Sequence, residues 1–173
     1  MLPNIDHLVY TVADLGAGMN TIERLFGVTP VPGGRHPVFG THNALVSLGM
    51  ETYLEIIAPD PGLPRPDRGM LFGMDGLRGS RLATWVLRTE AIDVLAAAAN
   101  SAGLGLGQMQ SGGRERPDGT MLSWQVTDPY AMPLGGAVRK SAADAGYWSS
   151  HKDPATQSDS PETERSWPPP TVE

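Results

Sequence analysis

Residues 5–12 read Ile-Asp-His-Leu-Val-Tyr-Thr-Val, and a pattern of apolar residues at helical spacing follows over residues 15–26. The first stretch alternates like a strand with one buried face, and it places His7 among apolar neighbours on a single face. Asp14 is a residue type that caps helix N-termini, and Gly27 suits the C-terminal stop. This part of the chain therefore predicts a strand and then a helix, with a histidine pointing from the strand.

The same order of elements occurs twice along the chain. After the first helix, residues 30–37 predict a bent strand or a hairpin arm, and apolar runs predict strands at residues 43–48 and 52–58. A connector over residues 61–80 leads to a second series, with strands predicted at 82–89 and 121–127 and a helix from Ile92 to Gly103. Such self-similarity is typical of an internal duplication.

The repetition predicts an α+β domain over residues 1–148, built from two tandem βαβββ modules. Module one spans residues 3–60 and module two residues 81–145. The second module is expected to be incomplete, because residues 135–144, where its last strand should come, have weak strand character. The final residues, 149–173, form an acidic segment rich in Pro, Ser and Thr, which predicts a disordered tail.

The bulk composition argues against several classes of protein. The net charge is −6 with a pI near 5.1, so no nucleic-acid partner is expected. No apolar run approaches the roughly 20 residues that cross a bilayer, and no secretory signal is visible, so we expect no membrane partner and a cytoplasmic location. Cysteine is absent, which removes thiolate ligands and nucleophiles. The Gly-rich segments match no dinucleotide fingerprint, and no organic cofactor is expected.

Glu55 and His7 are the leading candidates for function. Glu55 lies in the predicted strand Tyr-Leu-Glu-Ile-Ile at residues 53–57, and both polar groups interrupt apolar runs. Pointing into one cavity, an imidazole and a carboxylate form half of a site for a divalent metal. The alternatives are a buried histidine hydrogen-bonded within the sheet and a carboxylate partnered by a protonated His7 or by Arg35. Glu55 is also suited to proton transfer beside a carbonyl.

Residues 35–43 form the loop richest in polar groups. Arg35, His42 and Asn43 are expected to bind a polar small molecule, although His42 and Asn43 also suit turn chemistry. Trp85 and Trp124 stand in predicted strands of module two. Each is either a core residue or a platform for the ligand.

Three segments in this order resemble the glyoxalase-like branch of the vicinal oxygen chelate superfamily. They are residues 5–9 with Asp14-Leu15, residues 40–44, and residues 53–57. The resemblance covers residues 3–130 and implies two βαβββ modules that form a cupped, open barrel of mixed sheet. Members of the superfamily include lyases, isomerases, epimerases, ring-cleaving dioxygenases, and metal-free proteins that sequester or modify antibiotics, as in bleomycin resistance.

The resemblance also implies roles for individual residues. His7 and Glu55 match the ligands that module one gives to a divalent metal, which would be zinc, nickel, manganese or iron. Module two should supply two more, but Thr84 or Trp85 stands where His or Gln is expected, and the last strand is weak. The implied function is an enzyme acting on a small carbonyl or vicinally oxygenated compound, with Glu55 catalytic. The alternatives are a metal-free binding protein and an inactive relative, and a homodimer is a further expectation.

Overall fold

The computed structural model describes residues 4–49, 51–115, 121–131 and 135–140. The predicted tail over residues 149–173 lies outside the described residues, as does the end of the predicted domain. Within the described part of the chain, no helix is long and apolar enough to cross a membrane.

Two series of elements follow each other along the chain. The first consists of β1 (Asn4–Val12), α1 (Leu15–Phe26), β2 (Val31–His36), β3 (Thr41–Ser47) and β4 (Tyr53–Pro59). A short helix, η1 (Leu71–Gly76), lies in the connector. The second consists of β5 (Ser80–Arg88), α2 (Ile92–Ser101), β6 (Gln110–Glu115), β7 (Met121–Val126), η2 (Pro129–Ala131) and β8 (Gly136–Lys140). The predicted tandem βαβββ order is confirmed.

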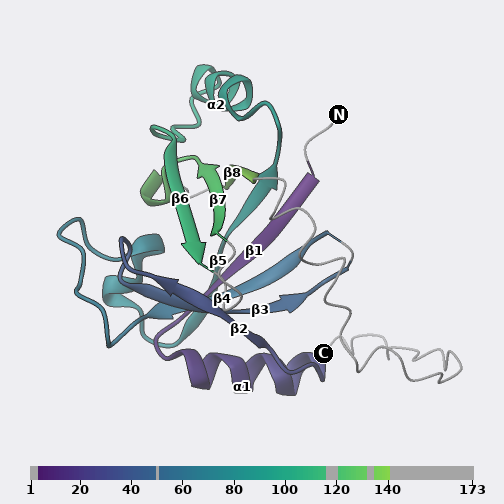
Figure 1. Cartoon of the computed structure of the whole chain (residues 1–173), viewed down its shortest axis with the longest axis vertical. Helices are drawn as coiled ribbons and strands as arrows, with labels where there is room; N and C mark the ends of the chain where they lie inside the picture. Colours follow the sequence, from purple (N-terminus) through teal and green to yellow (C-terminus); the bar gives the residue numbers. More distant parts are fainter. Residues whose placement is uncertain (1–3, 50, 116–120, 132–134, 141–173) are drawn as a thin grey trace, which may run out of the picture.

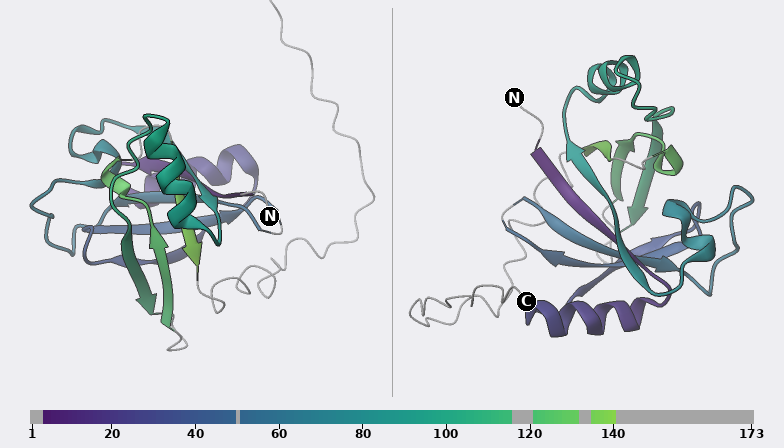
Figure 2. Two further views of the ribbon diagram at one scale, coloured as in Figure 1. Left: turned by 90° about the horizontal axis from the view of Figure 1, so that it is seen from above. Right: turned by 180° about the vertical axis from the view of Figure 1, so that it is seen from behind.

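All eight strands form one mixed sheet in the order β2-β3-β4-β1-β5-β8-β7-β6. Its centre is the antiparallel pair β1–β5, which places His7 opposite Val86. On either side, β4 runs parallel to β1 and β8 runs parallel to β5, so the two halves have the same topology. The sheet curls into a half-barrel, with α1 along the outer face of the first half and α2 beyond the second (Figures 1 and 2). The α+β half-barrel is therefore confirmed.

The prediction that module two lacks its last strand is wrong. Strand β8 pairs with β5 on one side and with β7 on the other. Two of its residues, Ala137 and Val138, are 0 % and 3 % exposed. The backbone of β8 finds partners on both edges, and this tertiary pairing overrides the weak strand propensity of Gly and Ala.

Helix α1 packs closely on the outer face of the sheet. The side chain of Asp14 accepts a hydrogen bond of 2.7 Å from the Ala17 N–H, and Gly27 ends the helix with φ 69°, so both predicted caps are confirmed. Ile22 joins an apolar cluster on this face. At Gly18 the helix comes so near the sheet that a Cβ atom would lie 2.8 Å from Val12.

The close approach predicts that Gly18→Ala destabilises the protein. We expect the free energy of unfolding in urea to fall by about 1–3 kcal/mol, because the added methyl group overpacks the interface with Val12. Gly16→Ala is the matched control in the same helix, since its Cβ atom would meet only the Asp14 side chain at 3.4 Å. The control should be neutral or stabilising by up to about 1 kcal/mol. Equal effects of the two substitutions would contradict the close approach.

Candidate active site in the cup

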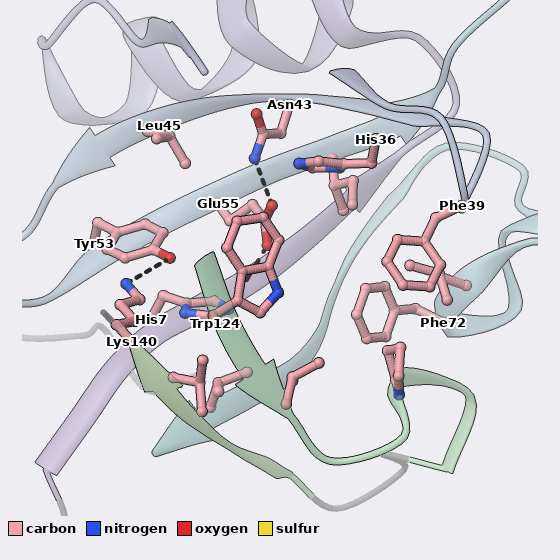
Figure 3. Close-up of a pocket in the computed structure, with 16 residues that line it drawn as sticks. His7, His36, Phe39, Asn43, Leu45, Tyr53, Glu55, Phe72, Trp124 and Lys140 are labelled. Atoms are coloured by element: carbon pink, nitrogen blue, oxygen red, sulfur yellow. Dashed lines mark hydrogen bonds and ion pairs between the residues drawn. The ribbon is translucent and has the colours of Figure 1, made fainter. Parts of the chain in front are cut away.

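A cavity of about 130 Å³ opens on the concave face of the sheet and takes residues from both modules. Figure 3 shows two regions in it: polar groups gather around Glu55, and aromatic rings lie beside them. The polar residues are His7, His36, Asn43, Tyr53, Glu55 and Lys140, and the aromatic rings are Phe39, Phe72 and Trp124. A small molecule in this cavity would contact both regions.

Glu55 is fixed by a chain of hydrogen bonds from the neighbouring strands. The Asn43 Nδ2 group donates to Glu55 Oε1 at 2.6 Å, and the Gly34 N–H donates to Asn43 Oδ1 at 2.9 Å. The second bond sets the orientation of the Asn43 amide, so that its NH₂ group faces Glu55. The other carboxylate oxygen, Oε2, lies 3.7 Å from His7 Nε2. The expected meeting of His7 and Glu55 on one face thus takes place.

His7 is oriented by two contacts. Its Nδ1 atom lies 2.7 Å from Asp6 Oδ1, and its ring stacks on Tyr53 with centroids 4.8 Å apart. Because the Asp6 carboxylate can only accept a hydrogen bond, Nδ1 carries the proton, and Nε2 faces Glu55. A carboxylate behind the imidazole is the usual way to fix a functional histidine.

Asp6 is fully buried and collects three donors. Besides His7, Arg88 Nε lies 2.9 Å from Oδ2 and Lys140 Nζ lies 2.7 Å from Oδ1. Burial by itself raises the pKa of Asp6, but the hydrogen bond from His7 and the charge of Lys140 outweigh it, so the pKa is held well below its usual range. Strict alternation along β1 would point Asp6 away from His7. A register shift between Ile5 and His7 allows both side chains to meet.

The donor set does not fit a divalent metal. Zinc and related ions take three or four protein ligands in most sites, and no group of three His, Cys, Asp or Glu is arranged to hold an ion among the described residues. None of the described residues that module two gives the cup is a usual metal ligand; they are Val86, Trp124, Val126, Pro129, Val138 and Lys140. Thr84 is buried opposite Val9, and its hydroxyl donates to the Trp85 carbonyl oxygen at 3.5 Å. His7 and Glu55 therefore remain a half-site.

The structure separates the predicted binding residues into two groups. Asn43 and Trp124 line the cup. Trp85 lies on the opposite face of the sheet, where it lines a second, apolar cavity of about 270 Å³ beneath α2.

Arg35 and His42 do not line the cup. They pair with each other across β2 and β3, and each is adjacent in the sequence to a residue that does line it, His36 and Asn43. Arg35 Nε contacts Asp60 Oδ2 at 2.6 Å, and this hydrogen bond lowers the pKa of Asp60. Arg35 is thus the partner of Asp60 rather than of Glu55.

Three polar residues of the cup were missed by the sequence reasoning. His36 faces the cavity because it pairs with Thr41, two positions from Asn43 in the same ladder. Side chains alternate between the two faces of a strand, so counting back in twos from Asn43 to Thr41 and then across to its partner would have identified His36. Tyr53 follows by the same rule from Glu55. Lys140 had no such signal, since it lies in the strand that the sequence did not predict.

Comparisons with known proteins agree with this architecture. Residues 5–160 match the family described as Glyoxalase-like domain, so the chain belongs to that family, a branch of the vicinal oxygen chelate superfamily. No curated protein matches it. It is similar to the crystal structure of methylmalonyl-CoA epimerase from Mycobacterium tuberculosis, at 16% identity and TM-score 0.52, over 82% of this chain and 91% of that one.

Two further structures are similar. One is a variant of methylmalonyl-CoA epimerase from Streptomyces coelicolor in complex with 2-nitronate-propionyl-CoA, at 17% identity and TM-score 0.51, over 82% of this chain and 100% of that one. The other is a hypothetical protein from Staphylococcus aureus, at 14% identity and TM-score 0.58, over 83% of this chain and 61% of that one. At these identities the similarity shows the fold alone.

The buried Asp6 predicts a loss of stability in acid. Because its pKa in the folded protein lies below the ordinary value of 3.8, its stabilising contribution is complete above that pH and is lost as the pH falls toward the folded value. One such group contributes a slope of up to about 1.4 kcal/mol per pH unit in the free energy of unfolding. We expect Asp6→Asn to be less stable than the unaltered protein at neutral pH. Below pH 4 its free energy of unfolding should change less steeply with pH.

The matched control is Asp67→Asn, which changes an exposed carboxylate outside the cup. The free energy of unfolding in urea is measured between pH 2 and 7 for the unaltered protein, Asp6→Asn and Asp67→Asn. An unchanged acid slope in Asp6→Asn would contradict the role given to this carboxylate.

Proposed function

We propose that the cup is the active site of an enzyme that moves a proton at a carbon next to a carbonyl group of a small oxygenated molecule. The observation that carries this proposal is the Glu55 carboxylate, fixed by Asn43 at one oxygen and adjacent to His7 at the other. A positioned carboxylate beside an apolar cavity is suited to take a proton from carbon and to return it. The class of reaction is an isomerisation or epimerisation, or the first step of a lyase.

The residues around Glu55 support distinct roles in this reaction. Asn43 occupies Oε1, so Oε2 is the oxygen expected to accept the substrate proton. His7, whose Nε2 atom faces Oε2 at 3.7 Å, can exchange the proton with Glu55. The rings of Phe39, Phe72 and Trp124 would bind the apolar part of the substrate and exclude water. The reaction is proposed without a metal, because His7 and Glu55 are too few ligands to hold one firmly.

A second candidate function is binding without catalysis. The aromatic lining favours it, since rings on one side and polar groups on the other are typical of sites that hold a small molecule. The cytoplasmic location and the homodimer stay predictions beside both candidates.

Glu55→Gln tests the proposed reaction. Deuterium incorporation from D₂O into a panel of small 2-oxo acids and 2-hydroxy ketones, followed by NMR, first identifies a substrate. We expect the substitution to lower the exchange rate about 10²–10⁴-fold, since the amide keeps the shape of the side chain and loses its basicity. Glu90→Gln, an exposed glutamate outside the cup, is the control and should exchange like the unaltered protein.

Full exchange in Glu55→Gln would refute Glu55 as the base. Suppose instead that no compound exchanges, while one of them raises the melting temperature of both proteins equally. The binding function would then replace the enzymatic one.

The two histidines of the β2–β3 hairpin give a second test. His36→Ala should raise KM for the substrate found above, by roughly tenfold if one hydrogen bond is lost. His42→Ala removes the same side chain from the same hairpin, but from the face away from the cup, and should leave KM unchanged. A larger effect at His42 would contradict the register of the hairpin.

A further inference from the structure

Lys140 places an ammonium group in the cup. Among the described residues that line the cavity it is the one lysine or arginine, and its side chain is 14% exposed. Its Nζ atom lies 2.7 Å from Asp6 Oδ1 and 3.3 Å from the Tyr53 hydroxyl, and it stands over the Tyr53 ring (Figure 3). An ammonium group has three N–H donors. Two have acceptors in the described protein, so the third is available to a molecule in the cavity.

Lys140 is one of two cations that contact Asp6. Arg88 contacts this carboxylate through Nε at 2.9 Å, and its Nη1 atom also lies 3.7 Å from the exposed carboxylate of Glu51. Of the two cations, Lys140 is the one that lines the cavity. Within the cup it is matched by the negative charge of Glu55, on the other side of the His7 ring.

Lys140 and Glu55 are placed on either side of the His7 ring by their separate contacts. Lys140 Nζ and His7 Nδ1 both contact Asp6 Oδ1, at 2.7 Å each, whereas His7 Nε2 faces Glu55 at 3.7 Å. The ammonium and the Glu55 carboxylate thus approach the His7 ring from its two nitrogen atoms, and both line the same cavity. A substrate bound between them would place its carbonyl oxygen against Lys140 and the neighbouring C–H bond against Glu55.

We propose, building on the proton transfer above, that Lys140 stabilises the oxyanion formed when Glu55 removes the proton. The electron pair of the C–H bond becomes a C=C bond, the carbonyl π pair moves onto oxygen, and the proton stays on Glu55. The negative charge moves from Glu55 to the substrate oxygen beside Lys140, and the total charge of the cup does not change. Return of the proton reverses every step, so no other reactant is consumed. The substrates of this site are compounds that form an enolate.

Oxalate is the probe for this oxyanion site, because its planar carboxylate resembles the enolate of a 2-oxo acid. Oxalate is titrated by calorimetry into the Glu55→Gln variant, with a metal chelator present. This substitution removes both the negative charge of Glu55 and its ability to take a proton. We expect oxalate to bind there, and Lys140→Met to weaken binding roughly tenfold to hundredfold, the effect of one hydrogen bond to a charged group. Lys140→Arg should bind oxalate more tightly than Lys140→Met.

Arg24→Met, on the exposed side of α1, is the control for the loss of one positive charge and should bind like its parent. If Lys140→Met fails to fold, Asp6→Asn/Lys140→Met removes the buried carboxylate as well, and it should also lose oxalate. Binding that appears only after zinc or manganese is added would overturn the proposal, as would undiminished binding in a folded Lys140 variant. If Glu55→Gln keeps its exchange activity but the Lys140 variants lose oxalate, the proposed base is wrong and the anion site stands.

Discussion

The buried carboxylate of Asp6 is the interaction on which the centre of the sheet and the polar end of the cup both depend. It binds its neighbour His7, Arg88 of β5 and Lys140 of β8, and so joins the two modules across their central strands. A carboxylate with no exposed surface is costly unless charged donors surround it. The three donors must therefore be in place together, and the orientation of His7 beside Glu55 follows from the same network.

The two halves of the sheet share a topology but differ in what they contribute. Module one gives the cup His7, Asn43 and Glu55, whereas the central strands of module two give Val86 and Val138. The outer faces differ as well. Helix α1 covers a buried apolar cluster, while a cavity lies beneath α2. The two modules therefore share a topology but give the site different groups: module two supplies the ammonium group of Lys140 and the ring of Trp124 and, among its described residues, no ligand for a metal.

The candidate site was predicted well where it depends on alternation within one strand. His7 and Glu55 meet because β1 and β4 are parallel neighbours, with Val9 opposite Glu55. The prediction was less accurate at the β2–β3 hairpin. The position of the turn decides which residues of the two strands face the cup, and the sequence did not fix that position. A one-residue change of phase exchanges the two faces, and this is why His36 reaches the cup while Arg35 and His42 lie on the other side.

The sequence by itself determined the order of elements, the caps of α1, the family of the fold and the strand positions of His7 and Glu55. These are local properties, because periodicity, capping and turn chemistry act over a few residues. Tertiary structure alone decided that Gly136–Lys140 is a strand, that a register shift turns Asp6 toward His7, and that Lys140 joins them. Each of these depends on a partner outside the local sequence: β8 pairs with β5 about 50 positions earlier, β1 pairs with β5 about 80 positions later, and Asp6 contacts Lys140 near the end of the described chain. No local pattern encodes such a partner.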